Sequence, residues 1–247
     1  MAAGWQLYRL SPGMWTLLVF TWWILIAVFN QIPYVGPIGT TVALPAFMMG
    51  FMAMCEELQH GRPLRPALLF VGFRSRLPSL IALGIFYVVA ILIVLWVSSW
   101  FDQGALLDWM MWAKAPPEIS LRDGSLYQAL LIATALSVPV FAAFWFAPIL
   151  AAWDGMSAGK SLFYSFFACL RNWRAFLLYG VVVAFYGLAF SVLVTVASIA
   201  SGFHPAAVRG FMLAATLILM PALFASFYVA YRDIFPPPEP PQATALA

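Results

Sequence analysis

Residues 77–101 read LPSLIALGIFYVVAILIVLWVSSWF, a stretch of 25 residues without one charged side chain. A bilayer core is about 30 Å thick, and a helix needs about 20 apolar residues to cross it. Lipid offers no hydrogen-bond partner to backbone N–H and C=O groups, so a spanning segment must be a helix or belong to a closed barrel. Because the stretch lacks the apolar and polar alternation of a barrel strand, it predicts a membrane-spanning helix.

Four further stretches lack charged residues, and they cover most of the remaining chain: residues 10–55, 124–153, 175–208 and 210–231. The first is too long for one helix, and it is interrupted by Asn30, Gln31, Pro33, Gly36 and Pro37. Residues before proline avoid helical geometry and glycine allows the chain to reverse, so a turn is predicted there. Six spanning helices result, over residues 12–30, 38–55, 80–100, 126–153, 175–201 and 208–231.

The composition agrees with this interpretation. Hydrophobic residues make up 64% of the chain and charged residues 9%, whereas a soluble domain has about 25% charged residues. The sequence therefore predicts an all-α, polytopic membrane helix bundle, with residues 1–231 as one transmembrane domain. Five prolines between residues 236 and 241 predict that residues 232–247 form an extended, flexible tail.

The distribution of lysine and arginine predicts the orientation. Nine of these residues flank the helices on the side that holds both termini: Arg9, Arg62, Arg65, Arg74, Arg76, Lys160, Arg171, Arg174 and Arg232. The other side has three: Lys114, Arg122 and Arg209. Basic residues are retained in the cytoplasm, so both termini and the tail are predicted to be cytoplasmic, in a bacterial inner membrane. The net charge of +3 then reflects topology and not an affinity for nucleic acid.

Two further expectations follow from the topology. The first helix is interpreted as an anchor, because its apolar stretch is longer than that of a signal peptide and no small-x-small cleavage site follows it. Cys55 and Cys169 both fall on the predicted cytoplasmic side. Thiols stay reduced in the cytoplasm, so no disulfide is expected.

The two predicted cytoplasmic connections, after the second and fourth helices, resemble each other. Each begins with a carboxylate and then a glycine, continues with a small residue and three apolar ones, and ends in a pair of arginines. The second connection has helical apolar spacing from Leu162 to Leu170, which predicts a helix lying in the membrane interface. Lys160 and Arg171 would then meet anionic headgroups. The pattern predicts two interfacial elbow helices and an internal duplication, flanked by the first and sixth helices.

Charged residues gather at these elbows: Glu56, Glu57, Arg74, Arg76, Asp154, Arg171 and Arg174. Carboxylates at a helix C-terminus face the negative end of the helix dipole, so they need a nearby cation, and the four arginines are the candidates. One interpretation is that these pairs fix the elbows to the bundle. The other is a polar cytoplasmic vestibule that binds a ligand or partner. The structural interpretation is favoured, because charge clusters at membrane boundaries are more often structural.

Catalytic, cofactor and metal motifs are missing. The run GMSAGKS at residues 155–161 has three residues between its glycines, whereas a phosphate-binding loop needs four and a preceding strand. His60 and His204 fall on opposite sides of the membrane, so they cannot share a metal. Met48, Met52 and Cys55 lie on one helix face, where helix packing is favoured over a site for Cu(I). No cofactor, metal ligand or catalytic residue is assigned.

The sequence also predicts how the bundle packs and where it meets the interface. Ala143, Ala147 and Ala151 recur every fourth residue, which allows a neighbouring helix to approach closely. Trp109 and Trp112 belong to a segment over residues 106–112 that is predicted to lie flat in the outer interface.

The order of helix, cytoplasmic elbow and helix, with the stretch from Pro148 through Gly155, Ser165 and Arg171-Asn172 to Leu177, resembles a group of uncharacterised bacterial six-helix inner-membrane proteins. That group is similar to the membrane-anchor domain of some glycerophosphodiester phosphodiesterases. No attached hydrolase domain is expected, so the resemblance does not imply phosphodiesterase activity. The resemblance implies a fold and a location, and no functional residues.

Three hypotheses for function remain. The favoured one is a non-enzymatic membrane protein that organises lipid or a partner complex. The second is a transporter of a small neutral or lipid-like solute, with a cavity lined by Pro45, Pro139, Ser137, Ser191 and Thr195. An enzyme, with a polar cluster around Glu57, Asp154 and Arg174, is the least supported. The expected partners are membrane lipids and, in the first hypothesis, a membrane protein; the sequence specifies no oligomeric state.

Overall fold

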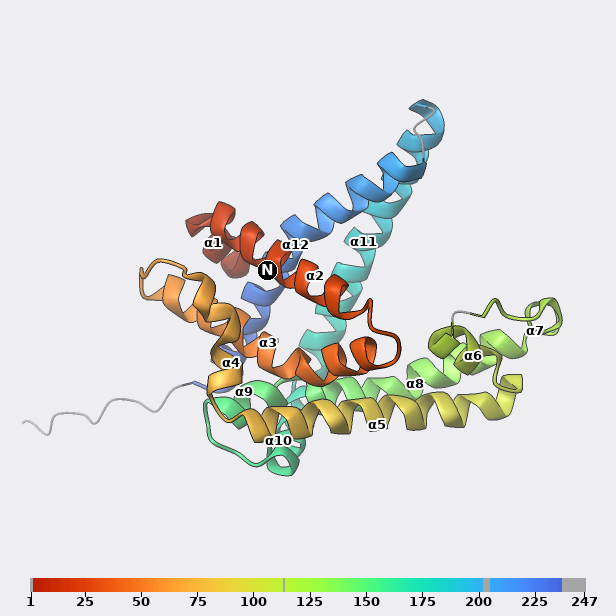
Figure 1. The fold of residues 1–247 in the computed structure, drawn as a ribbon, viewed down its shortest axis with the longest axis horizontal. Coiled ribbons are helices and arrows are strands. Elements are labelled where there is room, and N and C mark those ends of the chain that lie inside the picture. Colours follow the sequence, from red (N-terminus) through yellow and green to blue (C-terminus); the bar gives the residue numbers. More distant parts are fainter. Residues whose placement is uncertain (1, 113, 202–204, 237–247) are drawn as a thin grey trace, which may run out of the picture. The chain divides into compact units, whose positions relative to one another are not determined.

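The computed structural model describes residues 2–112, 114–201 and 205–236, and within these residues it contains helices and no strand. The helices follow one another in the order shown in Figure 1. Their bounds are α1 (Ala2–Leu10), α2 (Pro12–Phe29), α3 (Val35–Gln59), η1 (Pro66–Phe70), α4 (Val71–Arg74), α5 (Leu77–Asp102), α6 (Ala105–Trp112), α7 (Glu118–Arg122), α8 (Ser125–Trp145), α9 (Ala147–Ala152), α10 (Ala158–Arg171), α11 (Trp173–Ser201) and α12 (Pro205–Ile234).

Six segments are long and apolar enough to cross a membrane, and they correspond to the six predicted helices. They lie in α2, α3, α5, α11, α12 and the pair α8 and α9. The chain is therefore an all-α, polytopic membrane helix bundle. The helices run somewhat further than predicted: α3 continues past Cys55 to Gln59, and α12 ends at Ile234 instead of Tyr231. His204 lies outside the described residues, and so does the part of the predicted tail beyond residue 236.

The chain divides into two compact units. The first unit holds α1, α2 as far as Ile24, the segment Phe51–Leu69, α11 from Val181 onward, and α12. Helix α1, which the sequence did not predict, packs along α12, and Gly4 makes this possible because a Cβ at that position would lie 2.6 Å from the Ser226 nitrogen. The core of this unit is aromatic. The Phe51 ring stacks on Phe224 at 4.1 Å and meets the edge of Trp22 at 5.4 Å between ring centres.

The second unit comprises Leu25–Gly50 and Phe70–Gly180. Helices α5 and α8 lie side by side in it and run antiparallel (Figure 1). Leu95 packs with Leu126 and Ala129 near one end of the pair, and the Tyr87 and Phe144 rings meet at 5.2 Å towards the other. This pair forms the framework to which α3, α6 and α10 are added.

Two glycines allow close helix contacts in the second unit. A Cβ at Gly84 would lie 2.1 Å from the carbonyl oxygen of Val42, and a Cβ at Gly72 would lie 2.1 Å from that of Ala46. Real side chains do not approach a backbone oxygen so closely, so α5 and α4 touch the backbone of α3 only because these residues have no side chain. Of the predicted alanine row, Ala147 and Ala151 are fully buried and Ala143 is half-buried.

The predicted fourth helix, residues 126–153, is not continuous, because α8 ends at Trp145 and α9 begins at Ala147. Ser165 of α10 explains the break. Its hydroxyl accepts a hydrogen bond from the Phe146 N–H at 2.9 Å and donates one to the Ala142 carbonyl at 2.8 Å. A regular helix would pair these two backbone groups with each other. A side chain inserted into the ladder is a recognised cause of a kink, and Pro148 in the first turn of α9 adds to it.

The two elbows differ in form. The second is the 14-residue helix α10, as predicted, with Ser161, Ser165 and Cys169 on its buried face and Phe163, Phe167 and Leu170 exposed. The first forms only the 3₁₀ segment η1 and the single turn α4. The first elbow is therefore helical but short and irregular, because Pro63, Pro66 and Gly72 do not support a long regular helix.

Cys169 lies on the buried face of α10. Burial raises the pKa of its thiol to about 12. The thiolate is the reactive form of cysteine, so Cys169 stays protonated and unreactive near neutral pH. Cys55 is also a free, buried thiol.

Candidate functional site

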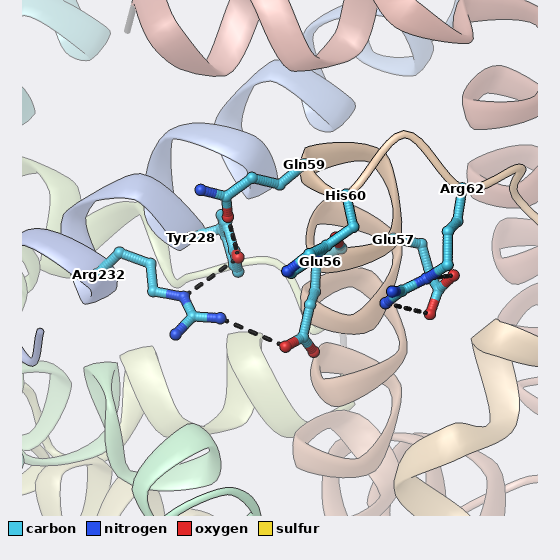
Figure 2. Close-up of polar contacts among 7 residues, drawn as sticks. All are labelled: Glu56, Glu57, Gln59, His60, Arg62, Tyr228 and Arg232. Carbon is cyan, nitrogen blue, oxygen red and sulfur yellow. Dashed lines mark hydrogen bonds and ion pairs between the residues drawn. The ribbon is translucent and has the colours of Figure 1, made fainter. Parts of the chain in front are cut away.

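The two carboxylates at the end of α3 point towards different arginines (Figure 2). Glu57 accepts two hydrogen bonds from Arg62, from Nε at 2.6 Å and from Nη2 at 3.1 Å. The hydrogen bond to Glu57 raises the pKa of the Arg62 guanidinium above its ordinary value. Gly61, with a φ of 69°, ends the helix, and the Arg62 N–H returns to the Glu57 carbonyl at 2.8 Å. This glycine cap brings Arg62 back beside Glu57.

Glu56 belongs to a network that joins α3 to α12 within the first unit (Figure 2). Arg232 donates from Nη2 to Glu56 at 3.3 Å and from Nε to the Tyr228 hydroxyl at 3.1 Å. The Tyr228 hydroxyl donates in turn to Gln59 Oε1. The Arg232 guanidinium also lies 5.4 Å from the centre of the Tyr228 ring. Each side chain supports the next, so the network fixes the end of α12 against the end of α3.

These partners differ from the expected ones. The cations beside Glu57 and Glu56 are Arg62 and Arg232, and not the arginines at the ends of the elbows. Glu56 and Glu57 belong to the first unit and the other five residues of the predicted cluster to the second, so the two groups are described separately.

In the second unit, Arg76 of the first elbow contacts the start of the second elbow. Its partner there is a backbone carbonyl and not a carboxylate. Arg76 Nη1 donates to the Gly155 carbonyl at 3.0 Å. A Cβ at Gly155 would lie 2.8 Å from Arg76 Nη2, and Gly155 has a φ of 66°, so only glycine suits this position. The contact ties the loop after Asp154 to the start of α5.

The remaining arginines of the predicted cluster lie at helix ends. Arg74 ends α4. Arg171 and Arg174 flank a surface hollow of about 370 Å³ at the junction of α10 and α11, together with Asn172, Trp173 and Ala175. The Arg174 guanidinium lies 5.6 Å from the centre of the Trp173 ring.

Metal-ligating side chains do not gather in the described part of the chain. Within residues 2–112, 114–201 and 205–236, no three His, Cys, Asp or Glu residues are grouped so that they could hold a metal ion. Met52 and Cys55 are fully buried in the packing of α3.

The largest concave feature that we describe is a pocket of about 760 Å³ in the second unit. Its walls come from the first turns of α3, from α5 and α8, and from α6. Residues from the four helices include Ile38, Ile91, Met110 and Ala133. At one end, the rings of Tyr34 and Trp112 meet edge to face at 5.6 Å.

Helix α6, which the sequence predicted as an interfacial segment, forms one wall of this pocket and is held by Asp102. This carboxylate is 3% exposed and accepts hydrogen bonds from the N–H groups of Gly104 at 3.0 Å and Leu106 at 2.6 Å. Leu106 then packs on Leu95 and Leu126. The sequence analysis assigned no role to Asp102, which directly follows the uncharged stretch of residues 77–101. Its position just before a glycine and an apolar helix was the available signal, since aspartate often caps a helix start.

The pocket coincides in part with the cavity that the transporter hypothesis required. Ser137 lines it, whereas Pro45 and Pro139 are not among its lining residues. Ser191 and Thr195 belong to the other unit. The sequence missed most of the lining, because the wall residues are ordinary apolar residues of spanning helices.

Comparison with known proteins identifies one informative relative. The chain is 33% identical over 245 residues to a probable inner membrane protein of Burkholderia thailandensis, and the match covers 96% of this chain and 90% of the relative. No protein-family model matches the chain, and no solved structure matches it. These comparisons lend no support to the predicted likeness to the membrane anchor of glycerophosphodiester phosphodiesterases. Because the similarity runs through nearly the whole of both chains, this chain belongs to the family of that inner membrane protein and is a multi-pass protein of the bacterial inner membrane.

Proposed function

We propose that the protein binds a lipid-like molecule within the inner membrane and thereby organises lipid, without catalysing a reaction. The observation that carries this proposal is the pocket of about 760 Å³ between α3, α5, α6 and α8. Small-molecule sites in proteins have volumes of about 300–1,000 Å³ and mostly apolar walls with a few polar groups. The pocket has both properties.

Physical considerations favour a lipid-like occupant. Side chains that border an empty space lose the dispersion contacts that a neighbour would supply, so an apolar space inside a bilayer favours occupation by an apolar molecule. Water is a poor alternative, because it needs two to four polar partners, and the walls are mainly leucine, isoleucine, valine and methionine side chains. Binding is favoured over passage, since Ser137 is the one residue of the predicted transport path that lines the pocket within the described chain.

Filling the pocket tests this proposal. Ala133 lines it and is half-buried, whereas Ala135, on the same helix, is exposed and does not line it. We expect Ala133→Phe to reduce the amount of lipid retained by the purified protein about tenfold, equivalent to a loss of about 1.4 kcal/mol. Ala135→Phe adds the same side chain outside the pocket and should retain lipid as the wild type does. Extraction in mild detergent followed by mass spectrometry measures the retained lipid per protein.

Equal lipid retention by the two variants would contradict the proposal. A melting curve in detergent accompanies each variant, because Ala133 also packs against the cluster of Leu95, Leu106 and Leu126. If Ala133→Phe does not fold, Ile91→Phe is the second variant, since Ile91 lines the pocket from α5.

We also propose that both termini lie in the cytoplasm. Nine lysines and arginines on the side of the termini against three on the other support this orientation. A reporter that fluoresces only in the cytoplasm, fused after residue 247, should be bright, and alkaline phosphatase at the same position should be inactive. The opposite pair of results would reverse the orientation while leaving the six spanning helices unaffected.

A further inference from the structure

We infer that the molecule in this pocket is a neutral lipid that carries a hydroxyl or carbonyl oxygen, and that the hydroxyls of Tyr87, Thr134 and Ser137 bind that oxygen. This inference rests on the proposed function and makes its ligand more specific. Thr134 and Ser137 are three residues apart on α8, so they lie on one face of that helix. Tyr87 lines the same pocket from α5.

These three hydroxyls differ from several others in the membrane segments. Serine and threonine in a helix usually bond to a carbonyl of the preceding turn. Several do so here: Thr21 to Leu17, Thr41 to Pro37, Ser98 to Leu95, and Thr216 to Met212. Among the residues that the structure describes, Tyr87, Thr134 and Ser137 have no such hydrogen bond, and all three line the pocket.

A hydroxyl without a partner is unfavourable in an apolar environment. Moving such a group from water into apolar surroundings without a hydrogen bond costs about 1–3 kcal/mol by protein mutational data. A ligand oxygen in the pocket would remove this cost, whereas a bare hydrocarbon chain would not. The lining therefore favours a ligand with a polar group.

The ligand is neutral because its site offers no charge. The lining residues include no aspartate, glutamate, lysine, arginine or histidine. A charged group in such surroundings would be strongly destabilised unless a counter-ion were present.

The depth of the hydroxyls in the membrane favours a neutral lipid over a phospholipid as the ligand. Ser137 is 12 residues beyond Ser125, where α8 starts, which is about 18 Å along the helix. Half of a bilayer core is about 15 Å. The polar groups of a phospholipid stay at the interface, so they would not reach Ser137. A neutral alcohol or carbonyl compound can enter the middle of the bilayer with its polar group.

Two probes of matched length test the inference on the full chain in detergent: deuterated 1-hexadecanol and deuterated hexadecane, quantified by mass spectrometry after gel filtration. The wild type should bind the alcohol more tightly. The double variant Thr134→Val with Ser137→Ala should lose about tenfold in affinity for the alcohol, as expected for two hydrogen bonds of ordinary strength. Its affinity for hexadecane should not change. Thr216→Val is the control, because that hydroxyl bonds within α12 and does not line the pocket.

The outcomes separate this inference from the proposed function. If both probes bind equally and the double variant binds them as the wild type does, the role of the hydroxyls is contradicted and the apolar pocket remains. If the protein retains a phospholipid that hexadecanol does not displace, the neutral ligand is contradicted. If neither probe binds and no lipid is retained, the proposed function fails as well.

Discussion

Gly84→Ala is expected to lower the stability of the protein by about 1–3 kcal/mol, the range found when a group is forced into a packed site. The new Cβ would lie 2.1 Å from the carbonyl oxygen of Val42 and 2.6 Å from its Cα. These are backbone atoms of α3, so they cannot rotate away as a side chain can. The two helices would have to separate, and the pocket between α3 and α5 would change shape with them.

The sign of this effect distinguishes packing from helix propensity. Alanine is a better helix former than glycine by about 1 kcal/mol, so an unhindered replacement should not destabilise. Gly180 in α11 is the matched control, since nothing lies within 4 Å of a Cβ there. Thermal unfolding in detergent should show a lower midpoint for Gly84→Ala and an unchanged or higher one for Gly180→Ala. Equal midpoints for the two variants would mean that the close approach of α3 and α5 is not required.

The spanning helices could be predicted from the sequence because their signal is local. Charges are excluded from the bilayer core, so uncharged stretches such as residues 77–101 mark each crossing directly. The same reasoning missed α1, which is nine residues long, carries Arg9 and is too short to span a membrane. It also treated residues 126–153 as one helix, because the side chain that opens the helix, Ser165, lies in another element.

The charged residues show the same limit. Glu57 pairs with Arg62, which is close in sequence and follows from the glycine cap at Gly61. Glu56 pairs with Arg232, 176 residues away, and no local pattern points to it. The pocket is harder still to predict from the sequence. Its lining residues Ile91, Ala133 and Thr134 are of the same types as residues that face lipid. Helix packing alone makes them a site.

Ser165→Ala is expected to destabilise the protein by about 1–3 kcal/mol, because it removes a hydroxyl that is the hydrogen-bond partner of two backbone groups. Ser165 is fully buried and bonds to the Phe146 N–H and the Ala142 carbonyl. The cost of losing a partner is high here, since lipid and apolar side chains offer no replacement. The substitution also removes the polar contact between α10 and α8, so the elbow should detach more easily.

Ser161→Ala is the control for this substitution. Ser161 lies one turn earlier on the same face of α10 and is equally buried, but its hydroxyl donates only to Ala158 of its own helix. We expect Ser161→Ala to shift the unfolding midpoint much less, because the Ser161 hydroxyl bonds to no backbone group of another helix. Ser165→Ala and Ser161→Ala could both unfold at the same temperature as the wild type. That result would mean that, without the serine, the Phe146 N–H bonds directly to the Ala142 carbonyl, as in a regular helix. In that case the break between α8 and α9 arises from Pro148, and the hydroxyl follows the kink without causing it.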